Sequence, residues 1–189
     1  MDLLKQYWKS KYSIFKFFAY FLVCIVLFYG IYYSIFFQDY LKDPILFAQT
    51  SISAALLSVL GFVVNVQGDS LSGMNILVKL SGGCDGLEAT ALLLAALSLF
   101  PIPFKYKWPG LLVGAITLSL LNIFRIVGLF LVALYQPDFF EFMHIQGGLY
   151  LFSFVGILIV IIWSDWALKR FRAELDLKQQ RDNLSTPLL

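Results

Sequence analysis

Apolar runs long enough to cross a lipid bilayer dominate this chain. A transmembrane helix needs about 20 consecutive, mostly apolar residues, and such runs lie at 14–37, 109–135 and 145–164, with a shorter one at 86–101. Only 14% of the 189 residues are charged and 60% are hydrophobic, whereas about a quarter of the residues of a soluble domain are charged. The sequence therefore predicts an all-α integral membrane protein with about four transmembrane helices.

Lysine and arginine set the predicted orientation of these helices, because cytoplasmic loops carry an excess of both. If the three basic groups of this chain all lie inside, both termini are cytoplasmic and the number of spans is even. A further apolar run at 44–61 is interrupted by Gln49, Thr50 and Ser53, so we expect an amphipathic or re-entrant helix on the outer face there. The three basic groups are Lys5, Lys9, Lys11 and Lys16, then Lys105 and Lys107, then Lys169, Arg170, Arg172, Lys178 and Arg181.

A small β-structure is predicted between the outer helix and the second span. Apolar residues alternate with more polar ones on either side of a turn region rich in glycine and serine, which is typical of a β-hairpin. We expect an extracytoplasmic hairpin at 62–82. Residues 1–165 would then form one membrane-embedded domain, and 166–189 a charged cytoplasmic tail.

Cys84 lies between two glycines and an Asp-Gly pair, just before the second span. Asp85 and Glu88 have the spacing of a helix capping box, with Asp85 as the N-cap. The helix N-terminus favours an anion, so a cysteine at this position can be activated as a thiolate. The alternative is an unreactive cysteine at a tight turn. Cys24, in the middle of the first span, is interpreted as a small apolar filler.

Arg125 lies inside the third predicted span. An arginine there costs about 2.5 kcal/mol or more on insertion scales, and marks a functional site by default. Ser119, Asn122 and Arg125 recur every three residues, which predicts a shared helix face turned toward protein or water. The alternative role is a structural hydrogen-bond anchor between helices.

His144, the only histidine, stands at the predicted outer start of the last span. Histidine titrates near neutral pH and can act as acid or base. An even number of spans places Cys84, His144 and the outer half of the Arg125 helix at one membrane face. Thiol, imidazole and guanidinium are the groups that cysteine acyl transfer needs as nucleophile, proton carrier and oxyanion partner.

Three stretches resemble the exosortase/archaeosortase family of membrane transpeptidases, and most closely the exosortase H subgroup. They are GGCDGLEATALLLAALSLFP, NIFRIVGLF and EFMHIQGGLY. The resemblance implies that Cys84 is the nucleophile, that Arg125 polarises the oxyanion and that His144 carries protons, with Asn122, Asp85, Glu88 and Ser119 in support. A small or hydroxyl residue often follows the cysteine in this family. Asp85 departs from that pattern, and its charge opposes thiolate formation unless it is offset.

The resemblance also implies an activity and a place. Such an enzyme cleaves exported proteins that carry a C-terminal motif, transmembrane helix and basic cluster, and transfers the new carboxyl end to an acceptor through a thioacyl intermediate. It would be a multi-pass protein of the bacterial plasma (inner) membrane, acting on the extracytoplasmic face. The implied partners are these substrates, membrane lipid and an unknown acceptor, with no metal, cofactor or nucleic acid. The subgroup implies an Ile-Pro-Thr-Leu-type sorting motif.

Two other functions are open from the residues alone. A non-catalytic membrane scaffold or assembly subunit for envelope polysaccharide or secretion machinery would use the Ser119, Asn122 and Arg125 stripe to bind a partner helix. A small transporter would use Arg125 in an anion path, but four spans with one intramembrane charge leave little for a pore. Thiol labelling of Cys84 separates the enzyme from the scaffold, since only the enzyme needs a reactive cysteine.

Overall fold

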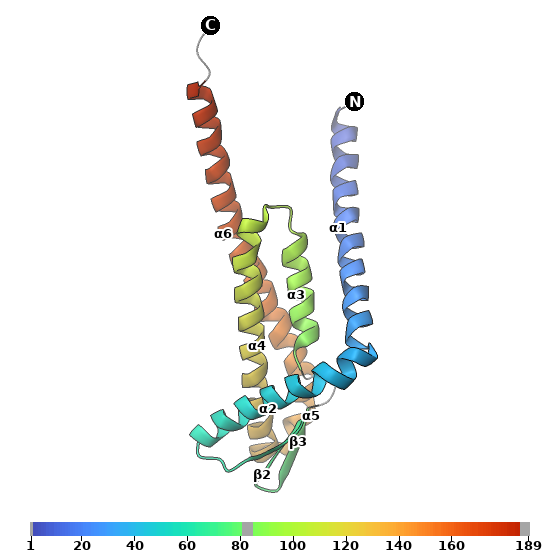
Figure 1. The fold of residues 1–189 in the computed structure, drawn as a ribbon, viewed down its shortest axis with the longest axis vertical. Coiled ribbons are helices and arrows are strands. Elements are labelled where there is room, and N and C mark those ends of the chain that lie inside the picture. The colour runs from blue at the N-terminus through green and yellow to red at the C-terminus, as the bar shows by residue number, and fades with distance from the viewer. Residues whose placement is uncertain (1, 81–84, 186–189) are drawn as a thin grey trace.

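Long helices stand side by side and a small sheet lies at one end of them (Figure 1). This computed structural model describes the backbone of residues 2–80 and 85–185 and the side chains of residues 14–80 and 85–181. Cys84 therefore lies outside the described residues. The elements are α1 (Asp2–Tyr32), a π-helical turn η1 (Phe37–Leu41), α2 (Lys42–Val59), β1 (Asn65–Gln67), β2 (Ser70–Gly73), β3 (Ile76–Lys79), α3 (Leu87–Leu99), α4 (Phe104–Tyr135), a 3₁₀ turn η2 (Pro137–Phe139), α5 (Phe140–Phe142), a π-helical turn η3 (Met143–Gly147) and α6 (Gly148–Ser185).

Among the described residues, three helical segments are long and apolar enough to cross a membrane: Ile14–Tyr32, Phe104–Tyr135 and Pro137–Arg181. The helix α3 is apolar but has only 13 residues, fewer than the roughly 17 that a spanning helix needs. The predicted class, a mostly helical membrane protein with a small β-structure, is confirmed at this level. The count of four spans stays a prediction.

The boundaries of the first and third predicted spans differ from the helices that form. The first helix ends at Tyr32 rather than at 37, because the Ser34 hydroxyl donates to the Ile31 carbonyl and accepts from the Phe37 N–H at 3.2 Å. A serine that bonds the backbone in this way ends one helix and starts the next. The third helix begins at Phe104 rather than at 109, directly after Pro103, which forms the N-cap with ψ 146°, and Pro109 lies inside the helix.

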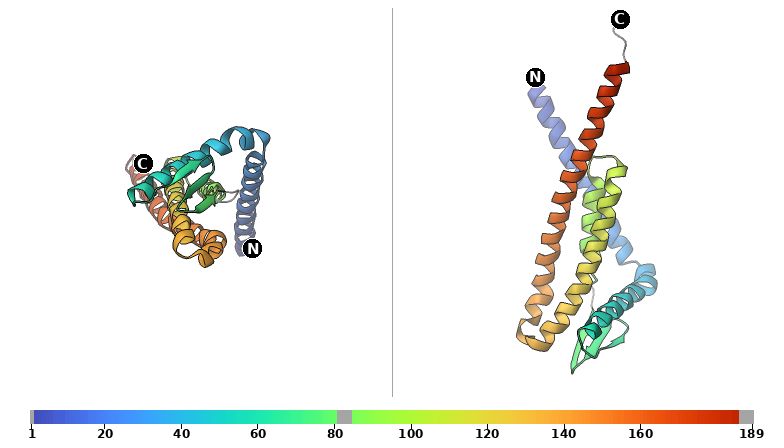
Figure 2. Two further views of the ribbon diagram at one scale, coloured as in Figure 1. Left: turned by 90° about the horizontal axis from the view of Figure 1, so that it is seen from below. Right: turned by 90° about the vertical axis from the view of Figure 1, so that its left-hand side faces the viewer.

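The helix α2 runs across the ends of the long helices rather than along them (Figures 1 and 2). It corresponds to the predicted outer helix at 44–61 and is not among the candidate spans. Its inner face buries Leu46 and Leu57 together with Thr50 and Ser53. The Thr50 hydroxyl donates to the Gly68 carbonyl at 2.9 Å, which joins α2 to the sheet.

Three short antiparallel strands, in the order β1-β2-β3, replace the predicted two-stranded hairpin at 62–82. The turn region that the sequence suggests holds a strand of its own. Gly68 has φ +59° at the first loop position, as a type II′ turn requires, and Met74 and Asn75 are both left-handed in the second loop, as type I′ requires. Leu71 and Val78 pair across the strands and bury against α2 and α4.

The helices α3, α4 and α6 share one core, built on Leu93, Leu97, Leu118 and Phe152. Trp163 belongs to the same core. Its indole N–H donates to the Tyr106 carbonyl at 3.0 Å, which joins α6 to α4. The helix α6 then continues without interruption to Ser185, so residues 166–185 of the charged segment are helical. Lys105 and Tyr106 both contact Glu174, which ties the start of α4 to this extension.

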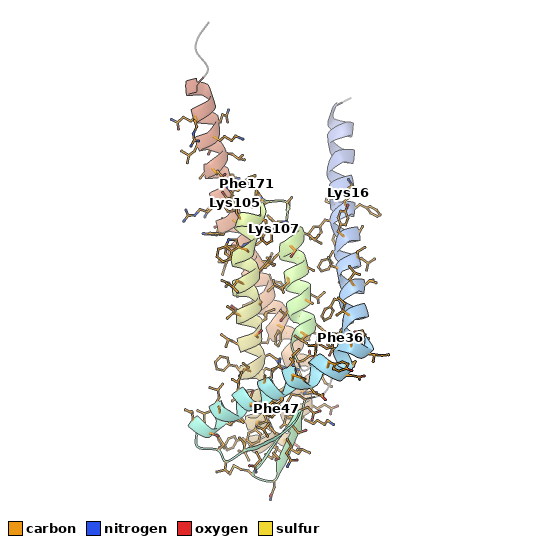
Figure 3. All side chains as sticks on the ribbon, in the orientation of Figure 1. Lys16, Phe36, Phe47, Lys105, Lys107 and Phe171 are labelled. Atoms are coloured by element: carbon orange, nitrogen blue, oxygen red, sulfur yellow. The ribbon has the colours of Figure 1, made fainter. Side chains whose placement is uncertain are left out.

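Both chain ends lie at the end of the helices opposite the sheet (Figure 1). Lys16, Lys105 and Lys107 lie toward that end, and Phe47 on α2 lies toward the other (Figure 3). The basic groups that the sequence singled out are thus separated from α2 and the sheet along the length of the molecule.

Gly110 is the position where a small substitution should most weaken the contact between α4 and α6. A Cβ there would lie 2.3 Å from Nε1 of Trp163, so we expect Gly110→Ala to destabilise the protein by about 1–3 kcal/mol through overpacking. Thermal unfolding in detergent measures the loss. Gly128 on the same helix has nothing within 4 Å of such a Cβ, so Gly128→Ala is the matched control. Equal melting temperatures for both variants would contradict this account.

Candidate active site

Arg125 and the His144 segment are in direct contact. Nη2 of Arg125 on α4 donates to the backbone carbonyl of His144 at 2.8 Å. The guanidinium lies against Gly148, where a Cβ would come within 2.7 Å of Cζ, and is 6.0 Å from the centre of the Phe152 ring. Only a residue without a side chain leaves room for the guanidinium here. The fold therefore brings together two of the residue types that the sequence proposed for one site.

His144 lies in the π-helical turn η3 rather than in a regular helix. Its half-buried ring stacks on Phe140, with the ring centres 5.6 Å apart and an interplanar angle of 9°. Single π-helical turns are rare and occur frequently at functional sites. The wide turn ends at Gly147, directly before Gly148, so it sets both the imidazole and the glycine surface on which Arg125 rests.

A groove of about 630 Å³ runs between α3 and α6, with Arg125 and His144 in its lining. Small residues make up much of its walls, and close packing of helices in lipid uses such residues. Gly86, two residues after Cys84 in the chain, is among its lining residues. The small residues of its walls are Gly86, Ala89 and Ala96 on one side and Gly148, Ser153 and Gly156 on the other.

Asp85, the residue joined to Cys84, is a buried carboxylate with a relative exposure of 3%. The hydroxyl of Tyr32 donates to its Oδ2 at 2.7 Å, and the backbone N–H of Leu87 donates to its Oδ1 at 3.1 Å. Both oxygens thus accept a hydrogen bond, as a buried charge requires. The carboxylate is directed to α1 and to the start of α3.

The predicted capping box does not form. The N-cap of α3 is Gly86, in the left-handed conformation with φ +70°, and not Asp85. Asp85 still accepts the Leu87 N–H from the position before the cap, so it serves one of the orphan donors of the helix start. Glu88 is the second residue of α3 and is half-buried in the wall of the groove.

The Ser119, Asn122 and Arg125 stripe does not form one face. Asn122 is fully buried and Ser119 is exposed, because successive steps of three residues rotate by about 60° around a helix with 3.6 residues per turn. Ser119 and Arg125 are therefore about 120° apart. The Asn122 amide donates to Oε1 of Gln49 at 3.2 Å, and a Cβ at Gly86 would lie 3.0 Å from its Cγ.

Comparison with known proteins identifies the family of the chain. Residues 13–161 match the family model of the transmembrane exosortases (Exosortase_EpsH). The chain belongs to the transmembrane exosortase family. No curated protein and no solved structure matches it. The matched range contains Cys84, Arg125 and His144 of this exosortase, and it ends before the charged part of α6.

Two residues that bond to Asp85, Tyr32 and Gln49, were not predicted from the sequence as candidate site residues. Gln49 stood out only as a polar interruption of an apolar run, and Tyr32 not at all. In the structure both bond to Asp85, since the Gln49 amide donates to the Asp85 carbonyl at 2.8 Å and Tyr32 to its carboxylate. The polar residue in the apolar run was a usable signal for Gln49. An aromatic residue at the end of a span is too common to have indicated Tyr32.

The part of this exosortase that the structure describes contains no set of side chains that could bind a metal ion. There, no three side chains of histidine, cysteine, aspartate or glutamate gather closely enough to hold an ion. The polar groups that do gather, Asp85 with Tyr32 and Arg125 with the His144 carbonyl, are already joined by hydrogen bonds.

Proposed function

We propose that this exosortase is a cysteine transpeptidase or protease that cleaves the C-terminal sorting signals of exported proteins. The observation that carries the proposal is the groove, whose lining includes Gly86, Arg125 and His144. A substrate chain in it would contact the guanidinium and the histidine that acyl transfer needs. Cys84 enters the proposal through its place in the sequence, two residues before Gly86.

The reaction follows from the chemistry of these groups. The Cys84 thiolate attacks the scissile carbonyl, the C–N bond breaks, and a thioester forms while His144 donates a proton to the leaving amine. An acceptor nucleophile, water or an amine, gives up its proton to His144 and attacks the thioester, and the C–S bond breaks to regenerate the thiolate. Arg125 stabilises the oxyanion of both tetrahedral intermediates, since a guanidinium is always charged and donates to oxyanions in a fixed geometry.

The proposed substrates carry a short motif, a transmembrane helix and a basic cluster. The groove supports this class because its walls are apolar helices with small residues, on which another helix can pack closely. The separation of the basic groups from α2 and the sheet supports cytoplasmic termini, with the site on the extracytoplasmic face of the plasma membrane. The α3 segment, extended to 86–101 by its flanking loops, would then be the short fourth span.

Filling the groove tests the role of the substrate helix. Gly156 lines the groove, and a Cβ there would have nothing within 4 Å, so the backbone position accepts a side chain and the ring of Gly156→Phe takes up space in the groove. We expect it to raise KM about tenfold for a substrate with a transmembrane helix, by removing binding energy that is shared by ground and transition states. KM for a short motif peptide should stay unchanged. Cleavage by purified enzyme in lipid nanodiscs gives both constants.

The matched control for the groove is Gly30→Phe on α1. Gly30 is also a helical glycine with open space around its Cβ position, but it does not line the groove. It should leave KM unchanged for both substrates. If Gly156→Phe and Gly30→Phe have the same KM for the membrane-anchored substrate, the groove does not hold the substrate helix.

A further inference from the structure

We infer that Tyr32 and Gln49 are positioning residues that hold the chain at Asp85, and so set where the adjoining Cys84 can reach. The inference rests on the proposed function, because it gives these residues a role in the same reaction. Neither residue lines the groove. Each acts through a hydrogen bond to Asp85.

The contacts at Asp85 come from helices that are far apart in the sequence. Tyr32, the last residue of α1, donates to the Asp85 carboxylate at 2.7 Å. Gln49 on α2 donates to the Asp85 carbonyl at 2.8 Å. Asn122 on α4 donates to Oε1 of Gln49 at 3.2 Å, which fixes the orientation of that amide. Side chain and backbone of one residue are thus held separately, and rotation of either would break a hydrogen bond.

Burial makes these hydrogen bonds costly to break. Asp85 is 3% exposed, Tyr32 is 3% exposed and Asn122 is fully buried, so water cannot readily replace a lost partner. Gly86, the next residue, is fitted against Asn122 so closely that a Cβ would lie 3.0 Å from Asn122 Cγ. The turn that follows Cys84 in the chain therefore has one arrangement that satisfies all of its neighbours.

The arrangement also gives α1 a specific task. The most apolar stretch of α1, within Ile14–Tyr32, is not buried against the rest of the protein. The helix α1 therefore adds little to the shared core of α3, α4 and α6. Its last residue nevertheless makes a buried hydrogen bond to the residue next to the proposed nucleophile. The two carboxylate oxygens of Asp85 accept hydrogen bonds from the Tyr32 hydroxyl and the Leu87 N–H.

Two substitutions of similar size remove the two hydrogen bonds to Asp85 one at a time. Tyr32→Phe removes the bond to the carboxylate, and Gln49→Met removes the bond to the carbonyl. We expect each to lower kcat for cleavage of the membrane-anchored substrate about 10- to 100-fold, because a small misplacement of a reacting group costs that much. KM should stay within about twofold, since substrate binding is not touched. Hydrogen exchange at the Leu87 amide, which bonds Asp85 directly, should be accelerated about tenfold in both variants by local opening.

Matched controls separate positioning from general stability. Tyr33→Phe removes the same hydroxyl from the next residue, which is 68% exposed, and should leave kcat and exchange unchanged. Thr50→Val removes a buried hydrogen bond of α2 to Gly68 without touching Asp85. It should lower the melting temperature but leave kcat and Leu87 exchange at wild-type values.

The two readouts distinguish failure of this inference from failure of the proposed function. If the wild-type protein cleaves and both variants cleave with the same kcat, the positioning role is wrong and the proposed function stands. If the wild-type protein cleaves nothing, exchange decides alone. If the Leu87 amide then exchanges at the wild-type rate in both variants, the inference is wrong. If it exchanges faster in both variants than in Thr50→Val, the inference is supported.

Discussion

Replacement of Cys84 by alanine is expected to abolish cleavage of the sorting signal while the protein still folds and inserts. The thiol is the only proposed nucleophile, and loss of a nucleophile typically lowers kcat to about a thousandth of the wild-type value or less. Cleavage of a fusion protein that carries the motif, transmembrane helix and basic cluster is followed in nanodiscs. Mass spectrometry of the wild-type enzyme should also trap the substrate peptide as a thioester on Cys84.

The other cysteine of the chain is the matched control. Cys24 lies half-buried in α1, beside a small cavity between α1 and α3 and outside the groove. Cys24→Ala should therefore cleave at the wild-type rate and give the same thioester. Undiminished cleavage by Cys84→Ala would rule out Cys84 as the nucleophile. Absence of cleavage by the wild-type protein would instead favour the scaffold role, in which the cysteine has no chemistry to perform.

Replacement of Arg125 by lysine should lower kcat/KM about 100-fold although the charge is kept. Removal of one oxyanion donor typically costs about 10²- to 10³-fold, and an ammonium does not reproduce the planar guanidinium. The flat group is what fits against Gly148, 6.0 Å from the centre of the Phe152 ring, while it donates to the His144 carbonyl. The measurement is kcat/KM for the same fusion substrate.

A second variant moves the guanidinium without changing it. In Gly148→Ala the new Cβ would lie 2.7 Å from Cζ of Arg125, so the side chain must shift. We expect an activity loss comparable to that of Arg125→Lys. Gly156→Ala on the same helix, where the Cβ position is open, should keep wild-type activity. If both arginine-directed variants are fully active, Arg125 is a structural anchor and has no role in the chemistry.

The class of this protein could be predicted from the sequence because it depends on the composition of local segments. Apolar length alone indicates a helix in lipid, and the helices α1, α4 and α6 occur where the apolar runs are. Their ends were predicted less well. Ser34 ends α1 through side-chain hydrogen bonds, and α6 continues to Ser185 because nothing in its charged part stops a helix.

The number of strands in the sheet could not be predicted from local sequence patterns. Alternating valines and isoleucines correctly indicated β-structure between 62 and 82, but a strand also formed within the presumed turn region. Loop residues decide this outcome, since two-residue loops at Gly68 and at Met74 and Asn75 fold the chain twice. The left-handed conformation of Met74 is held by the packing of β2 and β3 and is not suggested by its residue type.

The sequence by itself determined the membrane class and the residue types that stand out in an apolar chain: a cysteine before a helix, an arginine within a span and a single histidine. These are visible residue by residue, because a charge in lipid is costly wherever the chain folds. Tertiary structure decided how such residues are used. It set Arg125 on Gly148, exposed Ser119 while it buried Asn122, and brought Tyr32 and Gln49 to Asp85. Those contacts join helices distant in sequence, and only packing in three dimensions selects them.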